Sequence, residues 1–324
     1  MKPRVRHEEL RDVSTHFRFG ENWREYARHI DSERIAQAQS ELVRLLGLND
    51  LGEKRFLDIG SGSGLHSLAA SRLGCAHVLA TDIDADSVET TRAVLAAHAT
   101  SRTWECLQVS ILEMTPEEFG RFDVVYSWGV LHHTGAMWEA IRRAAALVSD
   151  EGLLAIALYL KTPFCGFWRA EKRIYSRSPR LLQIATRVLY VATASLREVL
   201  GGRNPFASIA MRRDGERSRG MRYWNNVHDW LGGYPYESAA PSVVESFVSN
   251  LGFDRIRALD TTPSLGMFGS GCAQYLFRKG TPSRSSEMRL SQPVDRWPVN
   301  LRSGCAGAED RPAAPRPSDR ASFD

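Results

Sequence analysis

Apolar residues follow two different patterns along this chain of 324 residues. Over residues 21–48 they recur every three or four positions with charged residues between them, which is typical of one or two amphipathic helices. Residues 55–159 instead alternate short apolar runs with helical patterns. Alternation of this kind predicts a parallel sheet with helices on its faces, and ligands then bind at the carboxyl ends of the strands.

The predicted elements make a seven-stranded sheet. Strands are predicted at 55–59, 77–82, 104–109, 122–127 and 152–159, with two more at 253–259 and 272–277. Helices are predicted at 64–73, 85–97, 135–148 and 181–200. The predicted fold class is therefore α/β: a doubly wound, Rossmann-like, mostly parallel seven-stranded sheet with N-terminal helices and a helical cap insertion.

Composition and pattern divide the chain into five predicted segments. Residues 1–50 form an N-terminal helical lid, residues 51–160 the alternating core, and residues 161–240 a basic helical insertion, called the cap from here on. Residues 241–280 complete the sheet. Residues 281–324 hold six of the 14 prolines and no apolar periodicity, and such a tail is expected to be disordered because it buries too little surface to offset its ordering entropy.

A glycine turn follows the first predicted strand. Gly60, Gly62 and Gly64 allow a sharp bend and a close approach of the backbone to a ligand. A dinucleotide fingerprint would place its third glycine where this chain has Leu65. Asp82 ends the second strand 20 residues after Gly62, where a carboxylate can accept hydrogen bonds from ribose hydroxyls.

These residues resemble the class I S-adenosylmethionine-dependent methyltransferases. The stretches Phe19-Gly20-Glu21-Asn22-Trp23, residues 126–135 and residues 229–235 resemble, more closely, a bacterial subgroup related to the ubiquinone- and menaquinone-pathway methyltransferases. The resemblance covers roughly residues 17–279. It implies an antiparallel pairing of the last two strands at the sheet edge and S-adenosylmethionine as the cofactor of residues 51–160.

The resemblance also implies roles at the cofactor site. Asp58 and the three glycines should surround the methionine portion, and Asp82 the ribose. Ser110 either contacts the adenine or belongs to an ordinary strand-end loop. The remaining expected cofactor contacts are Ile83, beside the base, and Ser127, after the fourth strand.

Aromatic residues suggest where a methyl acceptor binds. Trp128 could supply a cation–π contact to a sulfonium, or form a wall of the acceptor pocket, or be plain core. Trp23 either lines the lid or staples its helices to the sheet. Residues 223–237 contain five aromatics and a Gly-Gly-Tyr-Pro turn, which indicates either an acceptor pocket or packing within the cap. The residues expected to bind substrate there are Tyr223, Trp230 and Tyr234.

Three histidines are candidate general bases. A neutral imidazole suits the removal of a phenol, enol or hydroxyl proton. His132 and His133 follow the fourth strand, and either could instead cap the next helix or bond a backbone carbonyl. His228, beside Asp229, is the alternative base. Related O-methyltransferases of quinone pathways carry Glu-His where this chain has His-His, so no metal is expected.

The distribution of charge along the chain limits which binding partners are expected. Residues 161–222 hold 14 Lys/Arg against 4 Asp/Glu, a balance of +10 within a chain of net charge +4, so the remainder sums to −6. This basic segment indicates a solvated helical face, recognition of an acidic acceptor, or attachment to anionic lipid through residues 181–200. The sequence shows no recognisable RNA-binding module, so no nucleic-acid partner is expected.

The expected cellular location follows from the absence of a membrane-spanning run and of a signal core in the sequence. No apolar run approaches the ~20 residues of a spanning helix. The N-terminus shows no signal core, and five scattered cysteines fit reduced thiols, so a cytoplasmic location is expected. The oligomeric state is open.

The predicted activity is methyl transfer from S-adenosylmethionine to a small molecule. We expect O-methylation of a hydroxylated, quinone-like or secondary-metabolite acceptor by in-line displacement, with nitrogen or carbon as other acceptor atoms. The alternatives are a methyltransferase that acts on RNA or protein, and a scaffold that binds cofactor without catalysis.

Overall fold

A computed structural model describes residues 16–17, 19–100, 103–202, 223–262 and 271–280. They belong to one compact unit of residues 1–283. Its strands are β1 (Arg55–Ile59), β2 (His77–Asp82), β3 (Trp104–Gln108), β4 (Phe122–Trp128), β5 (Val148–Tyr159), β6 (Phe253–Leu259) and β7 (Cys272–Lys279). Its helices are α2 (Gly20–Ala27), α3 (Ser32–Leu46), α4 (Leu65–Arg72), α5 (Ala85–His98), α6 (Pro116–Phe119), η2 (Leu131–His133), α7 (Met137–Ala146), α8 (Cys165–Arg177), α9 (Arg180–Leu200), α11 (Tyr223–Gly232) and α12 (Pro241–Asn250).

The seven strands form one sheet in the order β3-β2-β1-β4-β5-β7-β6. Strands β1 to β5 run parallel, and β7 is antiparallel to both β5 and β6. The order reverses between β1 and β4, so the carboxyl ends of these two strands flank the point where ligands bind in doubly wound sheets. The predicted fold class, including the antiparallel pair at the edge, is confirmed.

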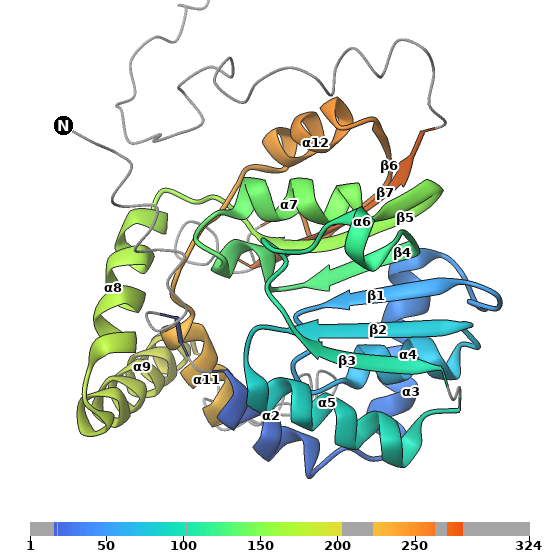
Figure 1. The fold of residues 1–324 in the computed structure, drawn as a ribbon. Helices are drawn as coiled ribbons and strands as arrows, with labels where there is room; N and C mark the ends of the chain where they lie inside the picture. The colour runs from blue at the N-terminus through green and yellow to red at the C-terminus, as the bar shows by residue number, and fades with distance from the viewer. Residues whose placement is uncertain (1–15, 18, 101–102, 203–222, 263–270, 281–324) are drawn as a thin grey trace, which may run out of the picture. The chain divides into compact units, whose positions relative to one another are not determined.

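Alternation within the strands gives the sheet two apolar faces. In β1, Leu57 and Ile59 join the core beneath α7 and α12, whereas Phe56 joins the core beneath α3, α4 and α5. Figure 1 shows these two sets of helices on opposite sides of the sheet. A strand buried on both faces reads as a continuous apolar run, which explains the pattern of residues 55–59.

The lid region folds as two helices. α3 begins at its N-cap Asp31, whose side chain accepts a hydrogen bond from the Arg34 amide, and ends at Gly47 in the left-handed conformation. α3 packs on α4, and α2 packs on α5. The first lid helix therefore lies beside the carboxyl end of β2.

The starts of β5 and α7 differ from the sequence prediction. β5 begins at Val148, four residues before the predicted start, because Phe122 pairs with Val148 across an irregularity in the β4–β5 register. Glu151 sits there at φ +60°. The polar residues between Val148 and Gly152 look like a loop in the sequence. α7 begins at Met137, two residues late, because Gly135 adopts φ +69°.

The described part of the cap is helical. Its helices α8, α9 and α11 pack around Tyr175, Val227 and Leu231. Figure 1 shows α8 and α9 on the side of α11 that is away from the sheet. Among the described residues, none of the helices is both long and apolar enough to span a bilayer.

Candidate functional site

The glycine turn after β1 is shaped by three residues in the left-handed region. Gly60, Gly62 and Gly64 have φ values of +75°, +56° and +77°. A side chain at Gly64 would approach the backbone Cα of Thr91 within 2.8 Å. These conformations and contacts explain why glycine stands at each position.

Asp82 is bonded directly to this turn. Its carboxylate accepts hydrogen bonds from the Gly62 amide and the Asp84 amide, each at 3.0 Å. Burial raises the pKa of the Asp82 carboxyl to about 6. Two carboxylate oxygens offer about four acceptor positions, so Asp82 keeps capacity for further donors such as hydroxyl groups.

Asp58 is more deeply buried than Asp82. It is 2% exposed, and its carboxylate accepts a hydrogen bond from the Ser67 hydroxyl at 2.6 Å. Burial raises the pKa of the Asp58 carboxyl, and the bond from Ser67 opposes this shift. The structure thus places Asp58 where it fastens α4 to β1.

The other three predicted cofactor residues occupy neighbouring strand ends. The buried hydroxyl of Ser127 donates to the Ile59 carbonyl at 3.0 Å and so ties β4 to β1. The Ser110 hydroxyl accepts from the Leu112 amide at 3.2 Å. The backbone carbonyl of Ile83 accepts from Gln108 at 3.1 Å. All three lie on the carboxyl edge that the glycine turn also reaches.

His133 faces the cap across the loop after β4. Its Nδ1 lies 2.7 Å from the Pro235 carbonyl oxygen, which accepts the Nδ1 proton of the neutral ring and leaves Nε2 with its lone pair. Burial lowers the pKa of His133 to about 4. The ring also contacts Phe19 at a centroid distance of 5.6 Å. His133 is therefore a neutral acceptor held in one tautomer.

His132 is more enclosed than its neighbour. It is 0% exposed and its ring centroid lies 3.9 Å from that of Tyr159. Burial, with smaller contributions from His133 and Lys172, holds the pKa of His132 well below its usual value. Within the described residues, neither ring nitrogen makes a hydrogen bond of normal geometry. His132 therefore stays neutral in its aromatic surroundings.

The turn from Gly233 to Glu237 fastens the cap to the histidine loop. The Glu237 amide donates to the His132 carbonyl at 3.0 Å, and the Glu237 carboxylate accepts from the Met137 amide at 2.8 Å. Burial raises the pKa of Glu237 to about 7. Tyr234, which is buried, accepts a backbone hydrogen bond from Phe17. No pattern in the sequence singled out Glu237, because its partner is 100 residues away.

His228 and Asp229 point to different neighbours. The Nδ1 of His228 lies 2.6 Å from the Tyr175 hydroxyl, and burial lowers the pKa of His228 to about 4. Asp229 accepts a hydrogen bond from the Asn22 amide group of the lid. Its second carboxylate oxygen is buried without a partner among the described residues, and burial raises its pKa to about 7. The two residues therefore do not form the His–Asp pair that their adjacency suggests.

A lysine that the sequence analysis missed lies beneath Trp230. Lys172 is 0% exposed, and its ammonium nitrogen lies 3.9 Å from the Trp230 ring centroid and 5.5 Å from that of Tyr236. It donates to the Trp230 carbonyl and lies 4.0 Å from the Glu171 carboxylate. Burial lowers the pKa of Lys172 and raises that of Glu171, and each charge opposes the shift of the other.

The remaining residues predicted to bind the acceptor are Trp23, Trp128 and Tyr223. The Trp23 ring lies over Gly62, about where a Cβ of that glycine would point. Trp128 packs, partly buried, against the core shared with α3, α4 and α5. Beside it, Gly129 has φ +77°, and a Cβ added there would meet nothing within 4 Å. Tyr223 begins α11, but its side chain lies outside the described residues.

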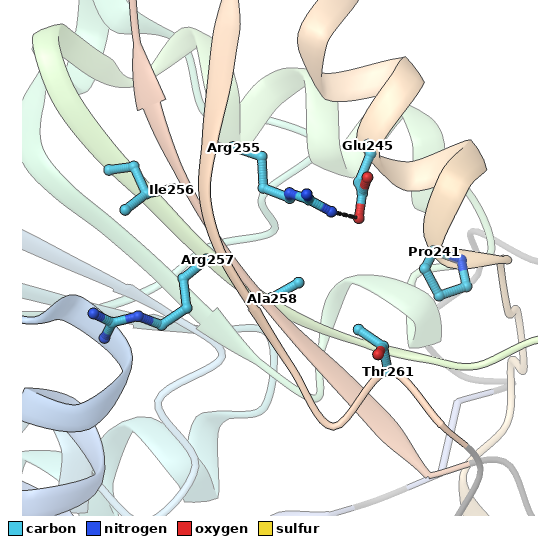
Figure 2. A pocket seen from close by; sticks show the side chains of 7 residues that line it. All are labelled: Pro241, Glu245, Arg255, Ile256, Arg257, Ala258 and Thr261. Carbon is cyan, nitrogen blue, oxygen red and sulfur yellow. Dashed lines mark hydrogen bonds and ion pairs between the residues drawn. The ribbon is translucent and has the colours of Figure 1, made fainter.

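A separate surface pocket lies between α12 and the edge strand β6. Figure 2 shows the Arg255 guanidinium directed at Glu245, with which it forms an ion pair, while Arg257 points to the other side. Arg257 donates to the carbonyls of Arg44 and Leu45. None of the residues that line this pocket is a predicted site residue. No group of three or more His, Cys, Asp or Glu within the described ranges could hold a metal ion.

Residues 57–154 match a family model described as a methyltransferase domain. A ubiquinone biosynthesis O-methyltransferase of Neisseria meningitidis is 30% identical over 118 residues, which are 36% of this chain and 49% of that protein. A ribosomal protein L11 methyltransferase of Pelobacter propionicus is 44% identical over 69 residues, 21% of each chain. The crystal structure of magnesium protoporphyrin IX methyltransferase from Synechocystis has a TM-score of 0.47 at 13% identity, covering 86% of this chain and 100% of that one. The chain thus spans at most about half the length of these curated relatives.

Proposed function

We propose that this class I S-adenosylmethionine-dependent methyltransferase transfers the methyl group to an oxygen atom of a small hydroxylated acceptor, which binds between the carboxyl edge of the sheet and the cap. Residues 57–154 match a methyltransferase domain, and we assign S-adenosylmethionine as its methyl-donating cofactor.

The residues present fit the cofactor. Asp82 retains acceptor capacity for ribose hydroxyls beside the glycine turn. A Cβ added at Gly129 would meet no atom within 4 Å, so there is room at the end of β4. We assign Asp58, Gly60, Gly62 and Gly64 to shaping the methionine end. Ile83 and Ser110 would flank the base, and Ser127 would hold β4 in register with β1.

We assign the general base to His133. When bound, the cofactor supplies an electrophilic methyl group on a sulfonium sulfur. The chain must orient the acceptor hydroxyl, exclude water and take up the proton as the new oxygen–carbon bond forms. Nε2 of His133 is suited to that proton, because the Pro235 carbonyl fixes the Nδ1 hydrogen and burial keeps the ring neutral. This hydrogen bond is the observation that carries the proposal.

The other histidines suit supporting roles. His132 is fully enclosed against Tyr159, so we assign it to positioning His133, whose ring centroid lies 4.4 Å away. His228 is engaged with Tyr175 inside the cap and would act as a base only if that hydrogen bond opened. We assign Trp23, Trp128, Trp230 and Tyr234 to the walls of the acceptor site, together with Tyr223.

The choice of oxygen as the atom that is methylated rests on the low pKa of His133. A neutral histidine with a low pKa is a weak base, and it matches an acidic hydroxyl such as a phenol better than an alcohol. The two curated relatives named above, the ubiquinone and the ribosomal protein enzymes, act on different acceptors by their names, although both are methyltransferases. Similarity to these relatives therefore supports methyl transfer more than it supports a particular acceptor.

The test is a methyl-transfer assay with labelled S-adenosylmethionine and a panel of catechols and hydroquinones, each compared with its aniline analogue. We expect labelled methyl ethers from the hydroxylated compounds. The substitution His133→Gln should lower kcat about 100-fold or more, because a general base contributes that much, while S-adenosylhomocysteine affinity stays unchanged.

The matched control is His98→Gln, on an exposed histidine at the end of α5. It should leave kcat unchanged. N-methylation of the anilines without O-methylation would overturn the choice of oxygen. Full activity of His133→Gln would overturn the choice of base without touching the cofactor assignment.

A further inference from the structure

The outer faces of α8 and α9 concentrate exposed apolar side chains. Of the twelve large apolar side chains that are exposed in the described part of the chain, ten lie on these two helices. Leu181, Leu189 and Leu200 of α9 are 82%, 64% and 79% exposed, and Ile174 of α8 is 67% exposed. Large exposed apolar patches on soluble domains mark interaction surfaces.

The exposed residues of α9 form a continuous helical stripe. Leu181, Val188 and Leu196 are spaced by seven and eight residues, so they share one face of the helix. Tyr190 on the opposite face and Val191 at the edge of that face pack against the cluster of Tyr175, Val227 and Leu231. α9 is therefore apolar on both sides, and only its inner side has a partner among the described residues.

Basic side chains are exposed on the same two helices. Arg173 and Arg177 lie one turn apart on α8, and Arg180 begins α9; all three are exposed. Among the described side chains of α8 and α9, the only carboxylate is that of Glu171, which is 16% exposed. The rim of this surface is therefore positively charged.

Charge decides between two occupants of this surface. A second copy of the chain would bring the same arginines against one another, and like charges at close range oppose association. A bilayer with anionic headgroups offers both the apolar interior that the leucines need and the negative charge that the arginines need. Because its inner face packs on α11, α9 would lie along such a surface.

We propose that the outer face of α8 and α9 binds the surface of an anionic lipid bilayer. Leu181, Leu189 and Leu200 insert at the boundary between headgroups and acyl chains, while Arg173 and Arg177 contact lipid phosphates. The site of methyl transfer would then lie beside a membrane. This inference stands apart from the assigned reaction, because it concerns binding alone.

The test is flotation of the full chain with vesicles of equal parts phosphatidylglycerol and phosphatidylcholine, compared with vesicles of phosphatidylcholine alone. We expect binding to the anionic vesicles that weakens as NaCl is raised. The double substitution Leu181→Glu/Leu189→Glu should reduce the bound fraction about tenfold or more, since it removes inserted apolar area and adds negative charge. Arg173→Glu/Arg177→Glu should abolish the preference for anionic lipid.

Leu107→Glu/Ile256→Glu, on β3 and β6, is the matched control, because it places the same changes on exposed apolar residues away from the cap. Thermal unfolding and S-adenosylhomocysteine binding confirm that each variant is folded. Absence of flotation overturns the proposal, as does equal flotation of the α9 variant and the control. A dimer that Leu189→Glu dissociates would assign the surface to a second copy and would also overturn it.

Discussion

The two halves of the candidate site differ in how their polar groups are satisfied. On the sheet side, Asp58 and Asp82 accept hydrogen bonds from residues within about 20 positions of each. On the cap side, Asp229 keeps a buried carboxylate oxygen that has no hydrogen-bond partner in the described ranges, whereas the Glu171 carboxylate has the Lys172 ammonium 4.0 Å away. Buried unpaired acceptors are costly, and they are common where a ligand or ion completes a site. The sheet side is thus complete without an acceptor molecule, and the cap side is not.

The largest expected change in the free energy of unfolding comes from close packing at the glycine turn on the sheet side. Gly60 and Gly129 have nearly the same φ, +75° and +77°, but only at Gly60 would a side chain overlap a neighbour, Val130. Gly60→Ala should lower the free energy of unfolding by about 2–5 kcal/mol, the sum of backbone strain and overpacking. Gly129→Ala should cost about 1–2 kcal/mol, from strain alone. Urea unfolding measures both, and equal losses would show that the close packing of the turn is unimportant.

A smaller effect concerns the unpaired carboxylate of the cap. The pKa of Asp229 is raised to about 7 in the folded chain, so the folded state binds more protons than the unfolded state between about pH 4 and pH 7. This contribution to stability is present at low pH and is lost as the pH rises through about 7. Asp229→Asn should therefore raise the free energy of unfolding by about 1–3 kcal/mol at pH 8 and change it little near pH 4.

Asp150→Asn, on an exposed carboxylate at the opposite edge of the sheet, controls for the loss of one negative charge. Thermal unfolding across the pH range compares the two variants. A destabilised Asp229→Asn at pH 8 would mean that the cap requires the ionised carboxylate, and the cap side would then be as complete as the sheet side.

The smallest effect concerns the join between the two halves. Glu237→Ala leaves the Met137 amide at the start of α7 without its acceptor and should cost about 1–2 kcal/mol. The matched change Glu245→Ala breaks a partly exposed ion pair with Arg255 and should cost about 0.5 kcal/mol or less. Chemical denaturation separates the two values. Equal costs would show that Glu237 does not hold the turn to α7.

The sheet side could be predicted because its signals are local. β1, the glycine turn and α4 occupy consecutive residues, and Asp82 follows Gly62 at a fixed spacing, so strand pattern and turn chemistry locate them together. The boundary errors at β5 and α7 occurred where positive φ values at Glu151 and Gly135 interrupt the regular pattern.

The cap side could not be predicted in the same way, because its contacts join distant positions. His133 bonds to a carbonyl 102 residues away, and Asn22 bonds to Asp229 across 207 residues. Lys172 looks like a surface residue in a basic segment, yet it is fully buried against Trp230. The adjacency of His228 and Asp229 suggested a pair, although a helix directs consecutive side chains apart. The catalytic and binding roles of these residues stay predictions.

The most direct test of the central claim is calorimetric titration of the full chain with S-adenosylhomocysteine, beside NAD, in the wild type and in Asp82→Ala. We expect micromolar affinity for S-adenosylhomocysteine and no binding of NAD. We expect a loss of about tenfold or more in Asp82→Ala, because hydrogen bonds to a charged carboxylate are removed, and no change in Asp150→Ala. Unchanged affinity in Asp82→Ala, or heat from NAD alone, would contradict the placement of the cofactor beside the glycine turn.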